Sequence, residues 1–194
     1  IRTAPRIESL VNLRGEIVQL VDRMLAHGAS STQITQIITL LNDHTVSRVI
    51  ELTLAEKGDP GIAFTWLCFG SEGRREQTLL TDQDNGILFE ARDAAHAADI
   101  RGKLLPLAQQ INQSLAQCGF TLCKGNIMAG NPDLCLSRAE WSRRFSAFIR
   151  EATPENLLAS TIYFDLRVVW GNEQGADQLR QEILDQIADN RLFQ

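Results

Sequence analysis

The chain of 194 residues suits one medium domain, or one domain with a helical annex. Hydrophobic residues make up 44% and charged residues 22% of the chain, which excludes a disordered tail, a collagen-like chain and a disulfide scaffold. The net charge is −5 and only three residues are lysine. We therefore do not expect avid, sequence-independent binding to nucleic acid, which needs many cations to neutralise phosphates.

Membrane and secretion signals are absent from the sequence. The longest uncharged apolar runs are far shorter than the roughly 20 residues that a bilayer requires, and no signal peptide opens the chain. The four cysteines form neither a CxxC pair nor a zinc pattern, so we interpret them as small hydrophobic residues of a protein in a reducing compartment. We expect a cytoplasmic protein with no membrane partner. Because the first residue is Ile and no helix cap ends the chain, we also expect a piece of a longer protein.

Two amphipathic helices are predicted for the first sixty residues. Apolar residues recur at steps of three and four over residues 6–27, and Gly28 is a typical C-cap. Ser30 and Gln33 have the spacing of a capping box, which starts a second helical stripe that ends at a Gly-Asp-Pro-Gly breaker. Residues 1–60 are thus expected to form a helical hairpin. Its apolar stripes need partners, which are either each other and the domain that follows, or a second subunit in a homodimer.

The chain changes character after this hairpin, where short apolar runs replace the helical stripes. The expected elements are strands at 63–69, 85–89 and 119–123, a helix at 93–117 with a defect at Pro106, and helices at 138–150, 155–170 and 175–190. This order predicts the α+β class, with helical segments on both sides of a small core. We divide the chain into a helical hairpin (1–60), an α+β core (61–136) and a C-terminal helical segment (137–194).

A polar turn rich in glycine follows the first predicted strand. It contains Gly70, Ser71, Gly73, Arg74 and Arg75. Glycines let the backbone approach a ligand closely, exposed amides in such a turn can face an anion, and guanidinium groups suit phosphate. The turn lacks the Gly-Lys-Ser/Thr of a Walker A loop and the Gly-x-Gly-x-x-Gly of a dinucleotide fold. Taken alone, it could equally be a simple turn.

Two aspartates open the second predicted strand. In a strand, Asp82 and Asp84 would point to the same face, where their carboxylates repel each other. A divalent cation relieves this repulsion, and Mg²⁺ favours one or two carboxylates together with substrate phosphates. The alternative is an acidic turn with no ligand. A phosphate-binding turn followed by a carboxylate pair is the combination that nucleotidyl transfer requires.

The pattern of Gly70-Ser71, ten residues and Asp82-x-Asp84 resembles the signature of the DNA polymerase β-type nucleotidyltransferase superfamily. The fuller string, Gly-Ser-Glu-Gly-Arg-Arg-Glu-Gln-Thr-Leu-Leu-Thr-Asp-Gln-Asp-Asn, is similar to one branch of it. That branch comprises bacterial signal-transduction nucleotidyltransferases related to the N-terminal domain of the PII protein uridylyltransferase. Its members often carry CBS and cyclic-nucleotide-binding domains upstream. The similarity continues through residues 119–132, 140–141 and 164–167, and covers about residues 35–190.

The resemblance implies a polymerase β-like core, with a mixed sheet and helices, that transfers a nucleoside monophosphate from an NTP to a protein hydroxyl. Asp82 and Asp84 would be catalytic and would bind Mg²⁺ or Mn²⁺, while the resemblance places the nucleotide phosphates at the turn. The implied nucleotide-binding residues are Gly70, Ser71, Gly73, Arg74, Arg75 and Lys124. The C-terminal segment would begin a truncated helical substrate-binding domain, and the nearest family activity is uridylylation of a PII protein.

One departure from the superfamily pattern keeps a second function open. Many active members have a third carboxylate on a later strand, whereas the predicted strand at 119–123 has none. Asp133 follows a proline, and Asp165 is expected in a helix, where it and Arg167 would pair with other partners than each other. The alternative function is a catalytically inactive domain that senses nucleotide or binds another protein.

Overall fold

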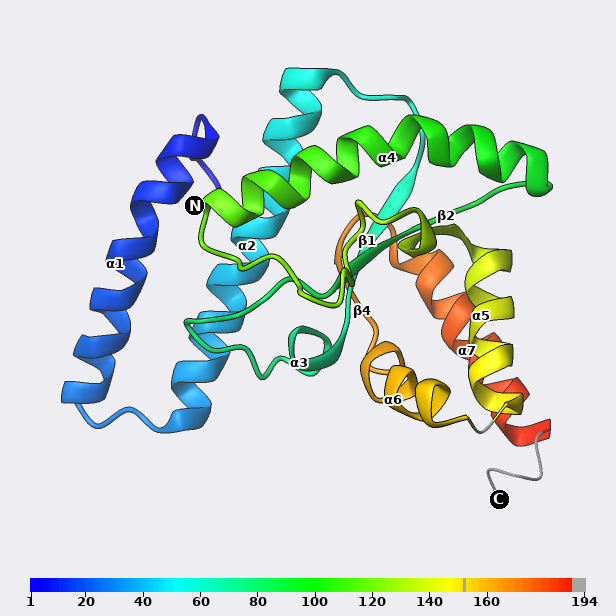
Figure 1. Cartoon of the computed structure of the whole chain (residues 1–194). Coiled ribbons are helices and arrows are strands. Elements are labelled where there is room, and N and C mark those ends of the chain that lie inside the picture. Colours follow the sequence, from blue (N-terminus) through cyan, green and yellow to red (C-terminus); the bar gives the residue numbers. More distant parts are fainter. Residues whose placement is uncertain (152, 190–194) are drawn as a thin grey trace.

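The computed structural model describes residues 1–151 and 153–189 (Figure 1). Its helices are α1 (Ile7–Ala26), α2 (Ser31–Lys57), α3 (Gly70–Gly73), α4 (Ala94–Gln117), α5 (Arg138–Arg150), α6 (Pro154–Tyr163) and α7 (Glu173–Asp189), with a 3₁₀ turn, η1 (Pro132–Leu134). Its strands are β1 (Phe64–Cys68), β2 (Asn85–Phe89), β3 (Cys135–Ser137) and β4 (Arg167–Trp170). Within the described ranges, no helix is long and apolar enough to cross a membrane.

The N-terminal hairpin forms as the sequence predicts. α1 and α2 lie side by side at one end of the molecule (Figure 1). The capping box is present, since the Ser30 hydroxyl accepts a hydrogen bond from the Gln33 amide and the Gln33 side chain accepts one from the Ser30 amide. At its other end α2 stops at Gly58, whose φ of 91° favours glycine.

The four strands form one mixed sheet in the order β3-β2-β1-β4. β1 runs antiparallel to both β2 and β4, whereas β2 and β3 are parallel. All residues of β1 and β2 are buried, which agrees with the uncharged apolar runs that predicted them. The fold is therefore α+β, as expected from the sequence.

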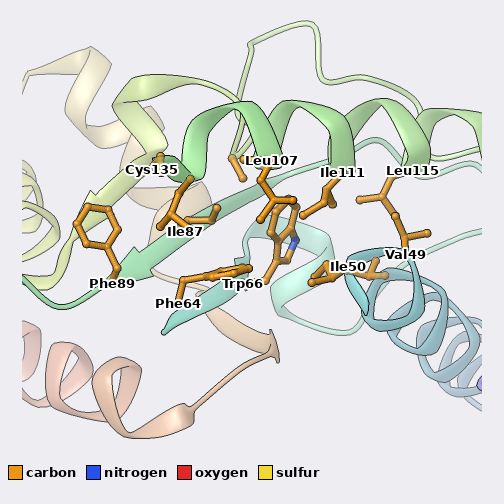
Figure 2. Close-up of a cluster of buried hydrophobic side chains, with 14 of the residues drawn as sticks. Val49, Ile50, Phe64, Trp66, Ile87, Phe89, Leu107, Ile111, Leu115 and Cys135 are labelled. Atoms are coloured by element: carbon orange, nitrogen blue, oxygen red, sulfur yellow. The ribbon is translucent and has the colours of Figure 1, made fainter. Parts of the chain in front are cut away.

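Helices cover both faces of this sheet. On one face Trp66 and Ile87 pack with Ile111 of α4 and with Val49 and Ile50 of α2 (Figure 2). On the other face the side chains of β1 and β2 meet α5 and α7 in a second cluster, which includes Leu67, Leu88, Trp141, Phe145 and Leu179. Successive strand residues alternate between the two clusters, so each face of the sheet has its own core.

Two expected elements differ in the structure. Residues 119–123 are not a strand, because only Thr121 forms a single bridge, to Asp82, and the third strand is β3 instead. The helix expected at 155–170 ends at Tyr163, and β4 follows it. β4 has β-branched and aromatic residues, and it pairs with the edge of β1 that β2 leaves open, which outweighs the helical spacing. Residue 190, the expected end of the last helix, lies outside the described residues.

Candidate active site

The glycine-serine turn lies directly against the aspartate segment. The turn is the one-turn helix α3, which begins at Gly70 with a φ of +54°. A side-chain carbon placed on Gly70 would lie 3.5 Å from Oδ2 of Asp84. The amide of Phe69, just before the turn, donates to the carbonyl of Asp84 over 2.9 Å. The structure therefore brings together the two motifs that the sequence analysis singled out.

Gly73 has a packing role at the other end of this turn. A side-chain carbon there would lie 1.6 Å from the backbone oxygen of Asp165, closer than any contact allows. Only glycine lets the segment before β4 lie against α3. The backbone of that segment thus forms one wall beside the turn.

Asp82 and Asp84 are held by the residues between and after them. Asp82 is exposed and Asp84 is half-buried, whereas Gln83 and Asn85 are buried, so the side chains alternate as in a strand although β2 begins only at Asn85. Asn112 of α4 donates to Oε1 of Gln83 over 2.8 Å and to Oδ1 of Asn85 over 3.0 Å. We call Gln83, Asn85 and Asn112 the buried amide cluster.

This cluster also reaches the segment that follows α4. Gln83 donates to the carbonyl oxygens of Asn112 and Phe120, each over 3.0 Å. The amides of Ala129 and Gly130 donate, each over 2.8 Å, to Asn85 and Asn112 respectively. Inward-facing amides thereby fix the backbone on which the two aspartates face outward.

Cys123 completes a group of three candidate metal ligands. One ligand atom each from Asp82, Asp84 and Cys123 lies within 4.8 Å of the others. The Thr121 bridge to Asp82 positions the cysteine segment, and the Gln83 amide donates to the Thr121 carbonyl over 2.8 Å. Three ligand atoms from two chain segments at this separation could hold one divalent cation.

The four cysteines differ in their surroundings. Cys68, Cys118 and Cys135 are buried and free, as expected for small hydrophobic residues. Cys123 is half-buried and forms a hydrogen bond with Asp84, so packing alone does not describe it. Its sequence surroundings gave no sign of this, because only the bridge between residues far apart in the chain brings it to the aspartates.

Two carboxyl groups of this region, those of Asp84 and Glu72, carry raised pKa values. Burial raises the pKa of Asp84, and the negative charge of Asp82 adds to the effect, while the hydrogen bond with Cys123 opposes it. Within the turn, the side chain of Glu72 is buried, and burial together with the charge of Asp43 raises its pKa to about 8. Glu72 was not singled out from the sequence. With this pKa it carries a proton at neutral pH. It is not a member of the ligand group found among the described residues.

The other predicted residues lie in different positions. Arg74 is engaged in ion pairs with Glu76 over 2.8 Å and with Asp165 over 2.6 Å. Arg75 is exposed, with a φ of 61°, and its carbonyl oxygen accepts from Thr39 of α2.

Two further charged residues were named in the sequence analysis. Lys124 is exposed and directly follows Cys123. Asp133 lies in η1 and is not a member of the ligand group found in the described part of the chain.

The expectation for Asp165 and Arg167 is correct in one respect and wrong in another. They do pair with other partners than each other, Asp165 with Arg74 and Arg167 with Asp43 of α2. Neither residue lies in a helix, because α6 has already ended. Arg167 is mostly buried and donates to both Asp43 oxygens over 2.8 and 2.9 Å, and to the carbonyl of Glu72 over 3.0 Å. It thereby links the hairpin to the turn.

A mixed open sheet covered by helices, with a glycine-serine turn beside two aspartates, is the arrangement of nucleotidyltransferases with a polymerase β-like core. The family described as "Putative nucleotidyltransferase DUF294" matches residues 15–155, which is most of the chain. The protein belongs to this family. No curated protein matches the sequence.

Proposed function

We propose that the protein transfers a nucleoside monophosphate from a nucleoside triphosphate to a hydroxyl group of an acceptor, which we take to be another protein. In this proposal Asp82 and Asp84 hold a divalent cation, Mg²⁺ or Mn²⁺. The observation that carries the proposal is the position of Gly70, where a side-chain carbon would lie 3.5 Å from Asp84. A triphosphate at the turn would therefore meet a cation at the aspartates.

In this proposal the residues of the turn bind the phosphates, and the two aspartates bind the cation. Gly70 lacks a side chain, so phosphate oxygens can approach the backbone closely, and Ser71 offers a hydroxyl beside it. A bound cation would neutralise phosphate charge and orient the attacking oxygen. The acceptor oxygen forms a bond to the α-phosphorus, the bond from that phosphorus to the bridging oxygen breaks, and pyrophosphate leaves. Lys124 and Arg75 are exposed cations available to the phosphates.

The finer assignment follows the family resemblance. UTP is the first nucleotide to test, and a PII-like regulatory protein is the first acceptor. A role in signal transduction would fit CBS or cyclic-nucleotide-binding domains upstream in a longer chain. The family match supports nucleotidyl transfer in general and is the basis on which these substrates are chosen.

Calorimetry of nucleotide binding tests this function. UTP, ATP, GTP and CTP are titrated with and without Mg²⁺ into the wild type and into Asp82→Asn and Asp84→Asn. Asp99→Asn is the matched control, because Asp99 is an exposed carboxylate on α4 that pairs with Lys103. We expect metal-dependent binding that both site variants lose and the control keeps. Binding to none of the four triphosphates by folded protein would refute the proposal.

A nucleotide sensor without catalytic activity is the second candidate. It is favoured by one observation: the ligand group in the described residues contains two carboxylates rather than three. The two candidates differ in pyrophosphate release from the bound nucleotide, with water or an added protein as acceptor. Metal-dependent binding with no pyrophosphate release over a panel of acceptors would favour the sensor.

A further inference from the structure

We propose that Cys123 is the third protein ligand of the cation at Asp82 and Asp84, and that this site therefore prefers thiophilic cations such as Zn²⁺ and Co²⁺ to Mg²⁺. The inference rests on the proposed function in one respect, namely that the aspartates bind a cation. It adds the identity of the third ligand and the class of metal.

The geometry brings the thiol to the position of a ligand. The ligand atoms of Asp82, Asp84 and Cys123 lie within 4.8 Å of one another. Ligand atoms on one tetrahedral zinc ion are about 3.3 to 3.8 Å apart, given metal–ligand bonds of about 2.0 to 2.3 Å. Movements of about 1 Å therefore bring all three onto one ion. The carboxyl group of Asp84 and the thiol of Cys123 lie close enough for each to affect the pKa of the other.

Burial raises the pKa of the Cys123 thiol, and nearby backbone amides oppose that rise. The backbone of Gly125 lies beside the Cys123 sulfur, since a side-chain carbon placed on Gly125 would be 3.7 Å from it, and the amides of Gly125 and Ile127 favour the thiolate. The tight turn that directs them is closed by a hydrogen bond of 3.0 Å from the amide of Asn126 to the carbonyl of Cys123, and Asn126 has a φ of 56°. Amide hydrogen bonds to sulfur stabilise a bound thiolate and orient it toward the metal. This feature is independent of the two carboxylates.

The choice of cation follows from the ligand atoms. Mg²⁺ takes oxygen ligands and keeps several waters, so a thiolate adds little to its binding. Zn²⁺ and Co²⁺ bind thiolate, imidazole and carboxylate, and the two oxygens and one sulfur of this site leave a fourth position open for substrate or water. Cys123 is half-buried, so the fourth position can be reached from solvent. When the metal binds, the thiol proton passes to solvent.

Cobalt provides a direct readout of the sulfur. Co²⁺ is titrated into the full chain, kept reduced by a phosphine, and the thiolate-to-cobalt charge-transfer absorption is followed in the near ultraviolet. We expect the band in wild type and in Cys118→Ala, and its loss in Cys123→Ala. Cys118 is the matched control because it is a free thiol buried elsewhere in the protein.

Calorimetry then measures the preference between cations. Zn²⁺ affinity should fall more than about tenfold in Cys123→Ala, since even loss of a group behind a metal ligand costs about 10- to 100-fold. Mg²⁺ affinity should be nearly unchanged in that variant. Cys123→Asp supplies a third carboxylate in place of the thiol, so it should bind Mg²⁺ more tightly than wild type does and show no cobalt band. Circular dichroism confirms that each variant is folded.

The outcomes separate this inference from the proposed function. If wild type binds Mg²⁺ and nucleotide through the aspartates but gives no cobalt–thiolate band, the inference is wrong and the proposed function stands. If the band survives in Cys123→Ala, another thiol binds the metal and the inference is again wrong. If folded wild type binds no divalent cation, both fail.

Discussion

Asn112 is the residue on which the buried amide cluster depends, and Asn112→Ala is the most informative test of the fold around the site. The side chain is 3% exposed and makes three hydrogen bonds, to Gln83, to Asn85 and from the amide of Gly130. The substitution removes all three. Asn85 keeps its bond from Ala129, whereas Gln83 Oε1 and the Gly130 amide lose the partner that Asn112 provides.

The magnitude follows from these two stranded groups. Each buried polar group left without a partner costs about 1–3 kcal/mol, so Asn112→Ala should lower the free energy of unfolding by about 2–6 kcal/mol. This is a large part of the roughly 5–15 kcal/mol that stabilises a typical domain. The backbone carrying Asp82 and Asp84 should also loosen, and cation affinity should fall although neither aspartate has changed.

Urea unfolding, followed by circular dichroism and by tryptophan fluorescence, measures this loss. Gln113→Ala is the control, because Gln113 is the next residue of α4 and is exposed, and a surface substitution of this kind changes stability by at most about 0.5 kcal/mol. A loss below about 1 kcal/mol for Asn112→Ala, with an unchanged denaturant slope, would refute the reasoning. It would mean that water satisfies the stranded groups at little cost.

Three further predictions test other parts of the structure. Gly73→Ala should destabilise the fold, because the added methyl group would lie 1.6 Å from the backbone oxygen of Asp165. Gly102 lies in open space on α4, so Gly102→Ala should instead stabilise the fold by about 0.5–1 kcal/mol. Thermal unfolding of the two variants measures this difference. Glu72 loses its proton near pH 4.5 in the unfolded chain and near pH 8 in the folded one, so wild-type stability should fall as pH rises across that window, by at most about 5 kcal/mol. Glu72→Gln has no proton to lose, and melting temperatures between about pH 5 and about pH 8.5 should show a flatter profile for it; equal slopes would contradict the assignment. Arg167→Met should lower the free energy of unfolding by about 3–5 kcal/mol, because it leaves the partly buried Asp43 unpaired. Adding Asp43→Asn should recover part of this loss. If the two losses were strictly additive in a double-mutant cycle, the pair would not be coupled.

The elements that the sequence predicts well are those whose signal is local. The capping box of α2, the helical stripe of α4 and the apolar runs of β1 and β2 each contain their own evidence, and the structure confirms them. β4 could not be predicted in this way. Its residues become a strand because they pair with the open edge of β1, about a hundred positions earlier in the chain.

The candidate site shows the same limit. The glycine turn and the aspartate pair are readable as motifs, and the structure places them in contact. The positions of Cys123 and Glu72 in the site could not be predicted from the sequence, because distant segments of the chain form their surroundings. The Thr121 bridge brings Cys123 to Asp82, and Asp43 and Arg167 lie close enough to Glu72 to act on its charge.

The alternation of inward amides and outward acids along the aspartate segment has an evolutionary consequence. The residues that maintain its shape, Gln83 and Asn85, are buried, and they are different residues from Asp82 and Asp84, which we propose to bind a cation. A substitution at an outward position can therefore change the chemistry while the backbone beneath keeps its course. A lineage carrying this segment could exchange one metal for another, or change a catalyst into a receptor, by single substitutions that change the stability of the fold very little.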